Sequence, residues 1–152
     1  MRILFLASWV MLLVISAGIA LVSVQSLFVA YSKSDAGLTQ QYSTAQIREQ
    51  GGEEAVKAFM ARRVTAATWA LAYGLLAIAV TLVPYRRGEQ WAWWALLVSV
   101  GLSQVLSMAR AVTVGTTSGA GTAGVLLAFT LLGLMAGAPR MFGNRESASP
   151  GE

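Results

Sequence analysis

Long apolar runs are the feature that most constrains the fold of this chain. The first run begins directly after Arg2 and extends from Ile3 to about Tyr31, which exceeds the roughly 20 residues that a helix needs to cross a bilayer. Only 12% of the 152 residues are charged, whereas soluble domains carry about 25%. The sequence therefore predicts an integral membrane protein with an all-α fold.

The apolar runs predict an antiparallel bundle of four transmembrane helices, which together form one domain over residues 1–138. We expect a short helical extramembrane loop after the first helix and a flexible cytoplasmic tail after the last one. The expected spans are about residues 3–31, 64–83, 91–112 and 123–138, with the loop over 32–63 and the tail over 139–152.

The first apolar run could also be a cleavable signal peptide, because it follows the basic residue Arg2. The apolar core of a signal peptide is about 7–15 residues long. The run from Ile3 to Tyr31 is much longer, so we expect a retained signal-anchor helix.

Charged residues gather in the loop between the first two spans. Ser43 is suited to cap a short helix, because its hydroxyl can accept a hydrogen bond from an N–H of the first turn. Gly51 and Gly52 are expected to break that helix, and Glu53 is expected to begin the next one, since an acid interacts favourably with the positive end of the helix dipole. Apolar residues then recur at helical spacing, which predicts a helix that continues into the second span.

Proline and glycine mark the other expected helix ends. Pro84 is expected to end the second span before a tight turn, and Pro139 is expected to end the fourth. Gly133 and Gly137 form a G-x-x-x-G motif in the fourth span. Such a motif lets helices approach closely, either within one bundle or at a homodimer face, and the sequence leaves both possibilities open.

The distribution of arginines predicts the orientation in the membrane, because basic residues of short loops and chain ends favour the cytoplasmic side. In a four-span chain one side carries Arg2, Arg86, Arg87, Arg140 and Arg145. We therefore expect both termini to lie in the cytoplasm. The first loop opposes this assignment, because it carries Lys33, Arg48, Lys57, Arg62 and Arg63 together with its acids.

Polar residues repeat at helical spacing in the third span. Ser99, Ser103, Ser107 and Arg110 fall on one stripe, which we expect to face the interior of the bundle. With this topology Arg110 reaches the outer membrane boundary. The resulting hypothesis is an outer-leaflet site for an anionic ligand, formed by Arg110, Arg63, Gln25, Ser107 and Gln104. In the structural alternative, Arg110 extends to the interface or pairs with an acid of the loop.

Aromatic and basic residues surround the turn between the second and third spans. They are Tyr85, Arg86, Arg87, Trp91, Trp93 and Trp94. This composition is typical of an aromatic belt at the cytoplasmic interface, where arginines attract anionic headgroups. Contact with a partner or a cofactor is the second interpretation, because three indoles exceed what anchoring requires.

The chain contains no Cys and no His, which removes thiolate nucleophiles, Cys/His zinc sites and histidine bases from consideration. We expect no cofactor, no metal, no catalytic residues and no nucleic-acid partner. The favoured function is an accessory or scaffolding subunit of a larger membrane assembly, with membrane lipids, other subunits or a second copy as partners. The alternatives are lipid or anionic-ligand binding or transport at the outer cluster, and last a membrane enzyme.

The segment from Pro84 to Leu97 reads Pro-Tyr-Arg-Arg-Gly-Glu-Gln-Trp-Ala-Trp-Trp-Ala-Leu-Leu. It resembles a segment of small bacterial four-helix integral membrane proteins of unknown function, in which an Arg-Gly-Glu turn leads into a Trp-rich third helix. The long first loop and the arginine near the start of the second helix are also similar. The resemblance implies a bacterial inner-membrane protein with four helices, and it implies no particular reaction.

Overall fold

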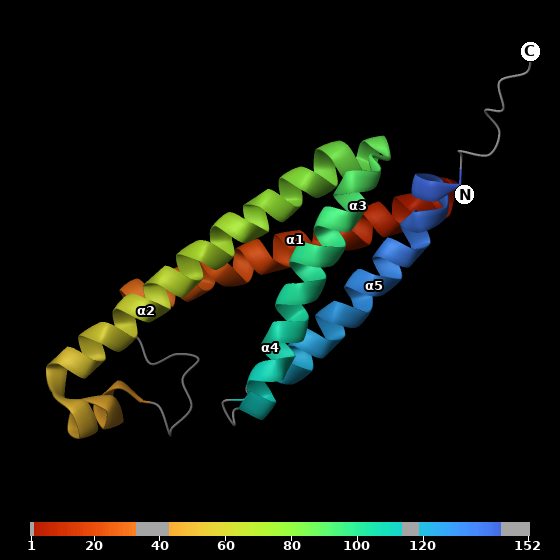
Figure 1. The fold of residues 1–152 in the computed structure, drawn as a ribbon. Helices are drawn as coiled ribbons and strands as arrows, with labels where there is room; N and C mark the ends of the chain where they lie inside the picture. The colour runs from red at the N-terminus through yellow and green to blue at the C-terminus, as the bar shows by residue number, and fades with distance from the viewer. Residues whose placement is uncertain (1, 33–42, 114–118, 144–152) are drawn as a thin grey trace, which may run out of the picture. The chain divides into compact units, whose positions relative to one another are not determined.

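The computed structural model describes residues 2–32, 43–113 and 119–143 (Figure 1), and these residues form helices and turns without any strand. The helical segments are α1 (Arg2–Tyr31), α2 (Thr44–Val80), the π-helical segment η2 (Thr81–Tyr85), α3 (Gln90–Leu96), the π-helical segment η3 (Leu97–Gly101), α4 (Leu102–Thr113) and α5 (Ala120–Phe142).

Four helical stretches are long and apolar enough to cross a membrane. They are Ile3–Tyr31, Thr44–Tyr85, Gln90–Ala109 and Ala120–Phe142. The prediction of an all-helical chain with four apolar helices of membrane length is therefore confirmed. The described chain has the character of a multi-pass membrane protein.

Residues that lie close together in space group the chain into two compact parts. The larger part combines the described residues of 1–16 with those of 76–152, and the smaller part is Ala17–Leu75. In the larger part, α5 packs along α3, η3 and α4 (Figure 1). The face of α5 that becomes buried repeats at helical spacing and consists of Ala123, Thr130, Gly133, Leu134, Gly137 and Met141.

The two glycines of the G-x-x-x-G motif pack inside the chain. A Cβ atom on Gly133 would lie 3.0 Å from the Met11 side chain and 3.2 Å from that of Leu12. A Cβ atom on Gly137 would overlap the Tyr85 hydroxyl. Gly137 is therefore required where α5 meets other segments of the larger part, and a side chain at Gly133 would press on Met11 and Leu12 of α1.

The helix does not end at Pro84, contrary to the expectation from sequence. Pro84 lies inside η2, and helical geometry continues through Arg87. Proline lacks an N–H and its ring clashes with the carbonyl four residues earlier, and a π turn accommodates such a site by shifting the hydrogen-bond register. The chain then reverses at Gly88, whose φ of 83° favours glycine, and Glu89 adopts an extended conformation before α3.

Pro139 likewise does not end the last helix. Residue Pro139 lies inside α5, which continues to Phe142 and closes with a 3.0 Å hydrogen bond from the Gly143 N–H to the Pro139 carbonyl. Residues 139–142 of the expected tail are therefore helical, and residues 144–152 lie outside the described residues.

In the smaller part, the second helix begins earlier than the expected span. α2 starts at Thr44, and the Ser43 hydroxyl accepts a hydrogen bond of 3.3 Å from the Gln46 N–H, as its position predicted. Gly52 has φ 72° and ψ −174°, a conformation reserved for glycine, and it kinks the helix where the sequence predicted a break. The expected loop over 32–63 is thus helical from residue 44, and residues 33–42 lie outside the described chain.

Candidate functional site

A buried hydrogen-bond chain joins three helical segments of the larger part. Ser8 Oγ of α1 lies 2.6 Å from the Gly133 carbonyl of α5 and 2.5 Å from the Tyr85 hydroxyl of η2. A carbonyl can only accept, so the single Ser8 proton is donated to Gly133. Tyr85 must therefore donate to Ser8. Both side chains are fully buried, and the chain of donors runs in one direction from Tyr85 through Ser8 to Gly133.

Aromatic packing fixes the position of Tyr85. Its ring is stacked on that of Phe5, with centroids 5.7 Å apart and planes 7° from parallel. On another side, Gly137 leaves room for the Tyr85 hydroxyl, because any side chain at that position would overlap it. We call this region, where α1, η2, α3 and α5 meet, the aromatic junction.

Side-chain donors also connect the helices of the aromatic junction to backbone carbonyls. The Trp9 indole donates to the Thr81 carbonyl at 3.1 Å, and the Trp93 indole donates to the Leu134 carbonyl at 2.8 Å. The Gln90 amide donates to the Met141 carbonyl at 2.8 Å. A carbonyl has two lone pairs, so it can accept such a bond in addition to its helical one. Each bond of this kind contributes about 0.6–2 kcal/mol between helices in a membrane.

The tryptophans of the expected aromatic belt fall into two groups. Trp93 is half-buried in the aromatic junction, whereas Trp91 and Trp94 are exposed. The Trp91 indole donates to the Glu89 carboxylate at 2.6 Å, and Trp94 packs edge-on against Trp93. Trp93 holds α3 against α5 through its bond to the Leu134 carbonyl, and the role of these tryptophans as an interfacial anchor or partner contact stays a prediction.

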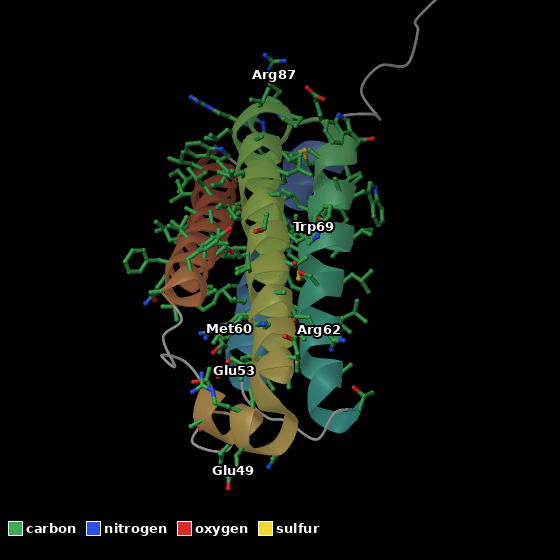
Figure 2. All side chains as sticks on the ribbon, turned by 90° about the vertical axis from the view of Figure 1, so that its left-hand side faces the viewer. Glu49, Glu53, Met60, Arg62, Trp69 and Arg87 are labelled. Atoms are coloured by element: carbon green, nitrogen blue, oxygen red, sulfur yellow. The ribbon has the colours of Figure 1, made fainter. Side chains whose placement is uncertain are left out.

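Two arginines lie over aromatic rings of α1. The guanidinium carbon of Arg86 is 5.2 Å from the centre of the Trp9 ring, and that of Arg140 is 4.0 Å from the centre of the Phe5 ring. The ion pairs found between described residues involve neither of them and lie in the smaller part, at Arg48–Glu53 and Lys57–Glu54. Arg87, labelled in Figure 2, follows η2 and is exposed.

Two of the serines in the predicted polar stripe of the third helix do not face the interior, and Ser103 is half-buried. Ser99 and Ser107 are exposed, and each donates to a carbonyl one turn earlier, at 2.5 and 2.8 Å. A serine that donates to a carbonyl of its own helix has satisfied its hydroxyl proton, so it needs no polar partner in the bundle interior. The buried line on this helix instead contains Leu96, Val100 and Gln104.

The residues of the hypothetical ligand site belong to both parts of the chain. Gln104 is buried on α4 and Ser107 is exposed one turn further on. Gln25 is exposed on α1 and Arg63 is half-buried on α2, both in the smaller part. Arg110 belongs to α4, but its side chain lies outside the described residues. The cluster around Arg110 therefore stays a prediction.

A groove of about 350 Å³ lies in the smaller part, beside the kink of α2. The segments on both sides of Gly52 line it with Thr44, Arg48, Glu53, Val56, Lys57 and Met60 (Glu53 and Met60 are labelled in Figure 2). Its walls are held by a 2.6 Å ion pair between Arg48 and Glu53. The sequence indicated the glycine break but gave no sign of a groove, because its shape depends on the angle of the kink.

Small exposed residues form a line along α2. Thr65, Thr68 and Ala72 follow a spacing of three and four, which Ala58 and Ala61 extend toward the helix start, and the larger Leu75 follows three residues after Ala72 (Arg62 and Trp69 mark this stretch in Figure 2). The hydroxyls of Thr65 and Thr68 donate to carbonyls of their own helix, both at 2.9 Å. We call this surface the α2 seam. Alanine and threonine dominate it, its spacing is regular, and its threonine hydroxyls are satisfied within α2.

The described part of the chain defines a helical multi-pass membrane protein, and it gathers no group of three His, Cys, Asp or Glu side chains that could hold a metal. The chain matches no protein-family model, and comparisons with curated proteins and with solved structures gave no match. Its function is therefore argued from its own residues.

Proposed function

We propose that the chain is a non-catalytic accessory or scaffolding subunit of a larger bacterial membrane assembly. The observation that carries this proposal is the exposed α2 seam. Within a bilayer, lipid tails are as apolar as leucine, so helix association depends on close packing of small residues. A regular exposed line of alanine and threonine at heptad spacing suits contact with a helix of another subunit.

The opposite face of α2 supports this interpretation. Ala67 and Gly74 are buried there, and a Cβ atom on Gly74 would lie 2.9 Å from the Ala20 backbone of α1. One small-residue face of α2 thus already packs closely against a helix. The α2 seam has the same chemistry on the other side of the helix, which favours a second packed helix supplied by a partner.

A second candidate is the binding of an anionic ligand or lipid near Arg110. The burial of Gln104 on α4 supports this candidate. A polar amide is rare inside a membrane helix unless a polar group binds it, and a bound ligand could be that group. Replacing Gln104 with Leu would reduce retention of an acidic lipid if this site exists and would leave retention unchanged if the amide only contributes to packing.

We further propose that the four apolar helices form an antiparallel bundle in the bacterial inner membrane, with both termini in the cytoplasm. Arg86, Arg87 and Arg140 at the ends of η2 and α5 favour this orientation. The chain has no native cysteine, so single cysteines can report orientation directly. A cysteine at Arg87 should stay protected from an impermeant thiol reagent in intact cells, and one at Glu49 should react.

Purification in mild detergent at native expression tests the scaffolding proposal. Mass spectrometry should find defined partner subunits with the wild-type chain. Ala72→Ile should remove them, because the larger side chain blocks close approach at the α2 seam. Ala66→Ile makes the same change at an exposed position outside the seam and should retain them. A wild-type chain that purifies alone, or equal effects of both variants, would contradict the proposal.

A further inference from the structure

We infer that Arg86 and Arg140 form a binding site for the phosphate of an acidic phospholipid headgroup. This site lies in the aromatic junction and uses neither the α2 seam nor the outer cluster, so it does not depend on the proposed scaffolding role. The sequence places Arg86 and Arg140 on the same side of the membrane, but it does not bring them to one site, because the rings beneath them belong to α1.

The rings of Phe5 and Trp9 place both guanidiniums on one face of α1. Phe5 and Trp9 are four residues apart on a helix, so their side chains are neighbours about one turn apart. Arg140 lies 4.0 Å above Phe5 and Arg86 lies 5.2 Å above Trp9. Arginines from α5 and from the end of η2 thereby converge on adjacent positions.

Both rings are themselves held in place. Phe5 is only 5% exposed and is stacked on Tyr85, and the Trp9 indole donates to the Thr81 carbonyl. Fixed rings restrict the guanidiniums above them, which lowers the conformational entropy lost when a ligand binds. The arginines are therefore ordered before a phosphate arrives.

The donors of these arginines remain available. A cation–π contact uses the charge of the guanidinium, and the N–H groups of the guanidinium can still donate to the oxygens of a phosphate. Neither arginine forms an ion pair within the described residues. Between described residues the cation–π contacts involve Arg86 and Arg140 and not Arg87, so Arg87 would add only diffuse attraction.

The surroundings of the arginines favour a lipid as the source of the phosphate. Two large apolar side chains are exposed close to the site in sequence: Leu6 lies between the two ring residues, and Val83 precedes Arg86. Both belong to helices of membrane length. Acyl chains can lie along such surfaces while the headgroup stays at the helix ends. The formal charge of +4 for the whole chain also favours an acidic headgroup over a zwitterionic one.

Lipid titration of the full chain in detergent, followed by native mass spectrometry, tests the site. Phosphatidylglycerol should be retained more strongly than phosphatidylcholine. Arg86→Gln and Arg140→Gln should each weaken phosphatidylglycerol binding roughly tenfold, the loss expected for a charged hydrogen bond. Arg62→Gln removes an exposed arginine from the smaller part and should leave binding unchanged.

Further variants separate a built site from general surface charge. Arg86→Lys with Arg140→Lys keeps both charges but loses the planar donors, and it should lose most of the selectivity. Trp9→Leu keeps every arginine and should also weaken binding. Wild-type binding by the lysine variant, or an equal loss with Arg62→Gln, would overturn the proposal. Displacement of the lipid by equimolar inorganic phosphate would overturn the assignment to a lipid.

Discussion

The Tyr85 and Ser8 hydroxyls lie 2.5 Å apart, and the Gly133 carbonyl fixes Tyr85 as the donor of the pair. These residues are separated by 77 positions in sequence and are fully buried. The bond thereby connects α1 to η2, and the second bond of Ser8 connects α1 to α5. In a bilayer, where water cannot replace a lost partner, this directed chain is a principal contact of the larger part.

The direction of the chain predicts unequal effects of removing its two hydroxyls. Tyr85→Phe leaves Ser8 bonded to Gly133 and should lower the free energy of unfolding by about 0.5–1.5 kcal/mol. Ser8→Ala leaves the buried Tyr85 hydroxyl without an acceptor and should cost about 1–3 kcal/mol. Unfolding in mixed micelles measures both values. Ser8→Ala in a Tyr85→Phe background should then cost less than it does alone, and a larger loss for Tyr85→Phe than for Ser8→Ala would refute the assigned direction.

Packing at the G-x-x-x-G motif predicts that Gly137 tolerates no side chain. Gly137→Ala should destabilise the protein by about 1–3 kcal/mol or more, because the new methyl group overlaps the Tyr85 hydroxyl. Gly121 lies in the same helix with open space around it, so Gly121→Ala should be neutral or stabilising by up to about 1 kcal/mol. Thermal unfolding in detergent compares the two, and similar midpoints would show that α5 does not pack on Tyr85.

The kink at Gly52 predicts a position where alanine is not accepted. Gly52→Ala should cost about 1–3 kcal/mol, because only glycine readily adopts φ 72° with ψ −174°. Strain there should loosen residues 44–51 and the Arg48–Glu53 ion pair, so amide hydrogen exchange in this segment should become faster. Gly18→Ala, in open space on α1, serves as the matched control. Unchanged exchange in the Gly52 variant would contradict the observed kink.

Much of the helical layout could be predicted from local sequence patterns. Apolar length gave the membrane helices, the Ser43 hydroxyl predicted the start of α2, and Gly52 predicted its break. Such features depend on residues close together in the chain. Pro84 and Pro139 misled the prediction of helix ends, because proline penalties can be absorbed by a π turn or by the last turns of a packed helix.

The candidate sites were harder to predict, because they depend on which helix faces meet. Ser99 and Ser107 looked like an interior stripe, yet both satisfy their hydroxyls within their own helix and are exposed. The bond between Ser8 and Tyr85 and the placement of Arg140 over Phe5 join segments distant in sequence. No pattern in a single sequence specifies such pairs.

Photo-crosslinking from the α2 seam tests the central claim, that this seam receives a helix of another subunit, most directly. A photoreactive group attached to a single cysteine at Ala72 should form one defined protein adduct in native membranes, and Thr68→Ile should abolish that adduct. The same group at Ala66 should crosslink to lipid. Lipid adducts alone at both positions, or a protein adduct that persists in the Thr68→Ile chain, would contradict the claim.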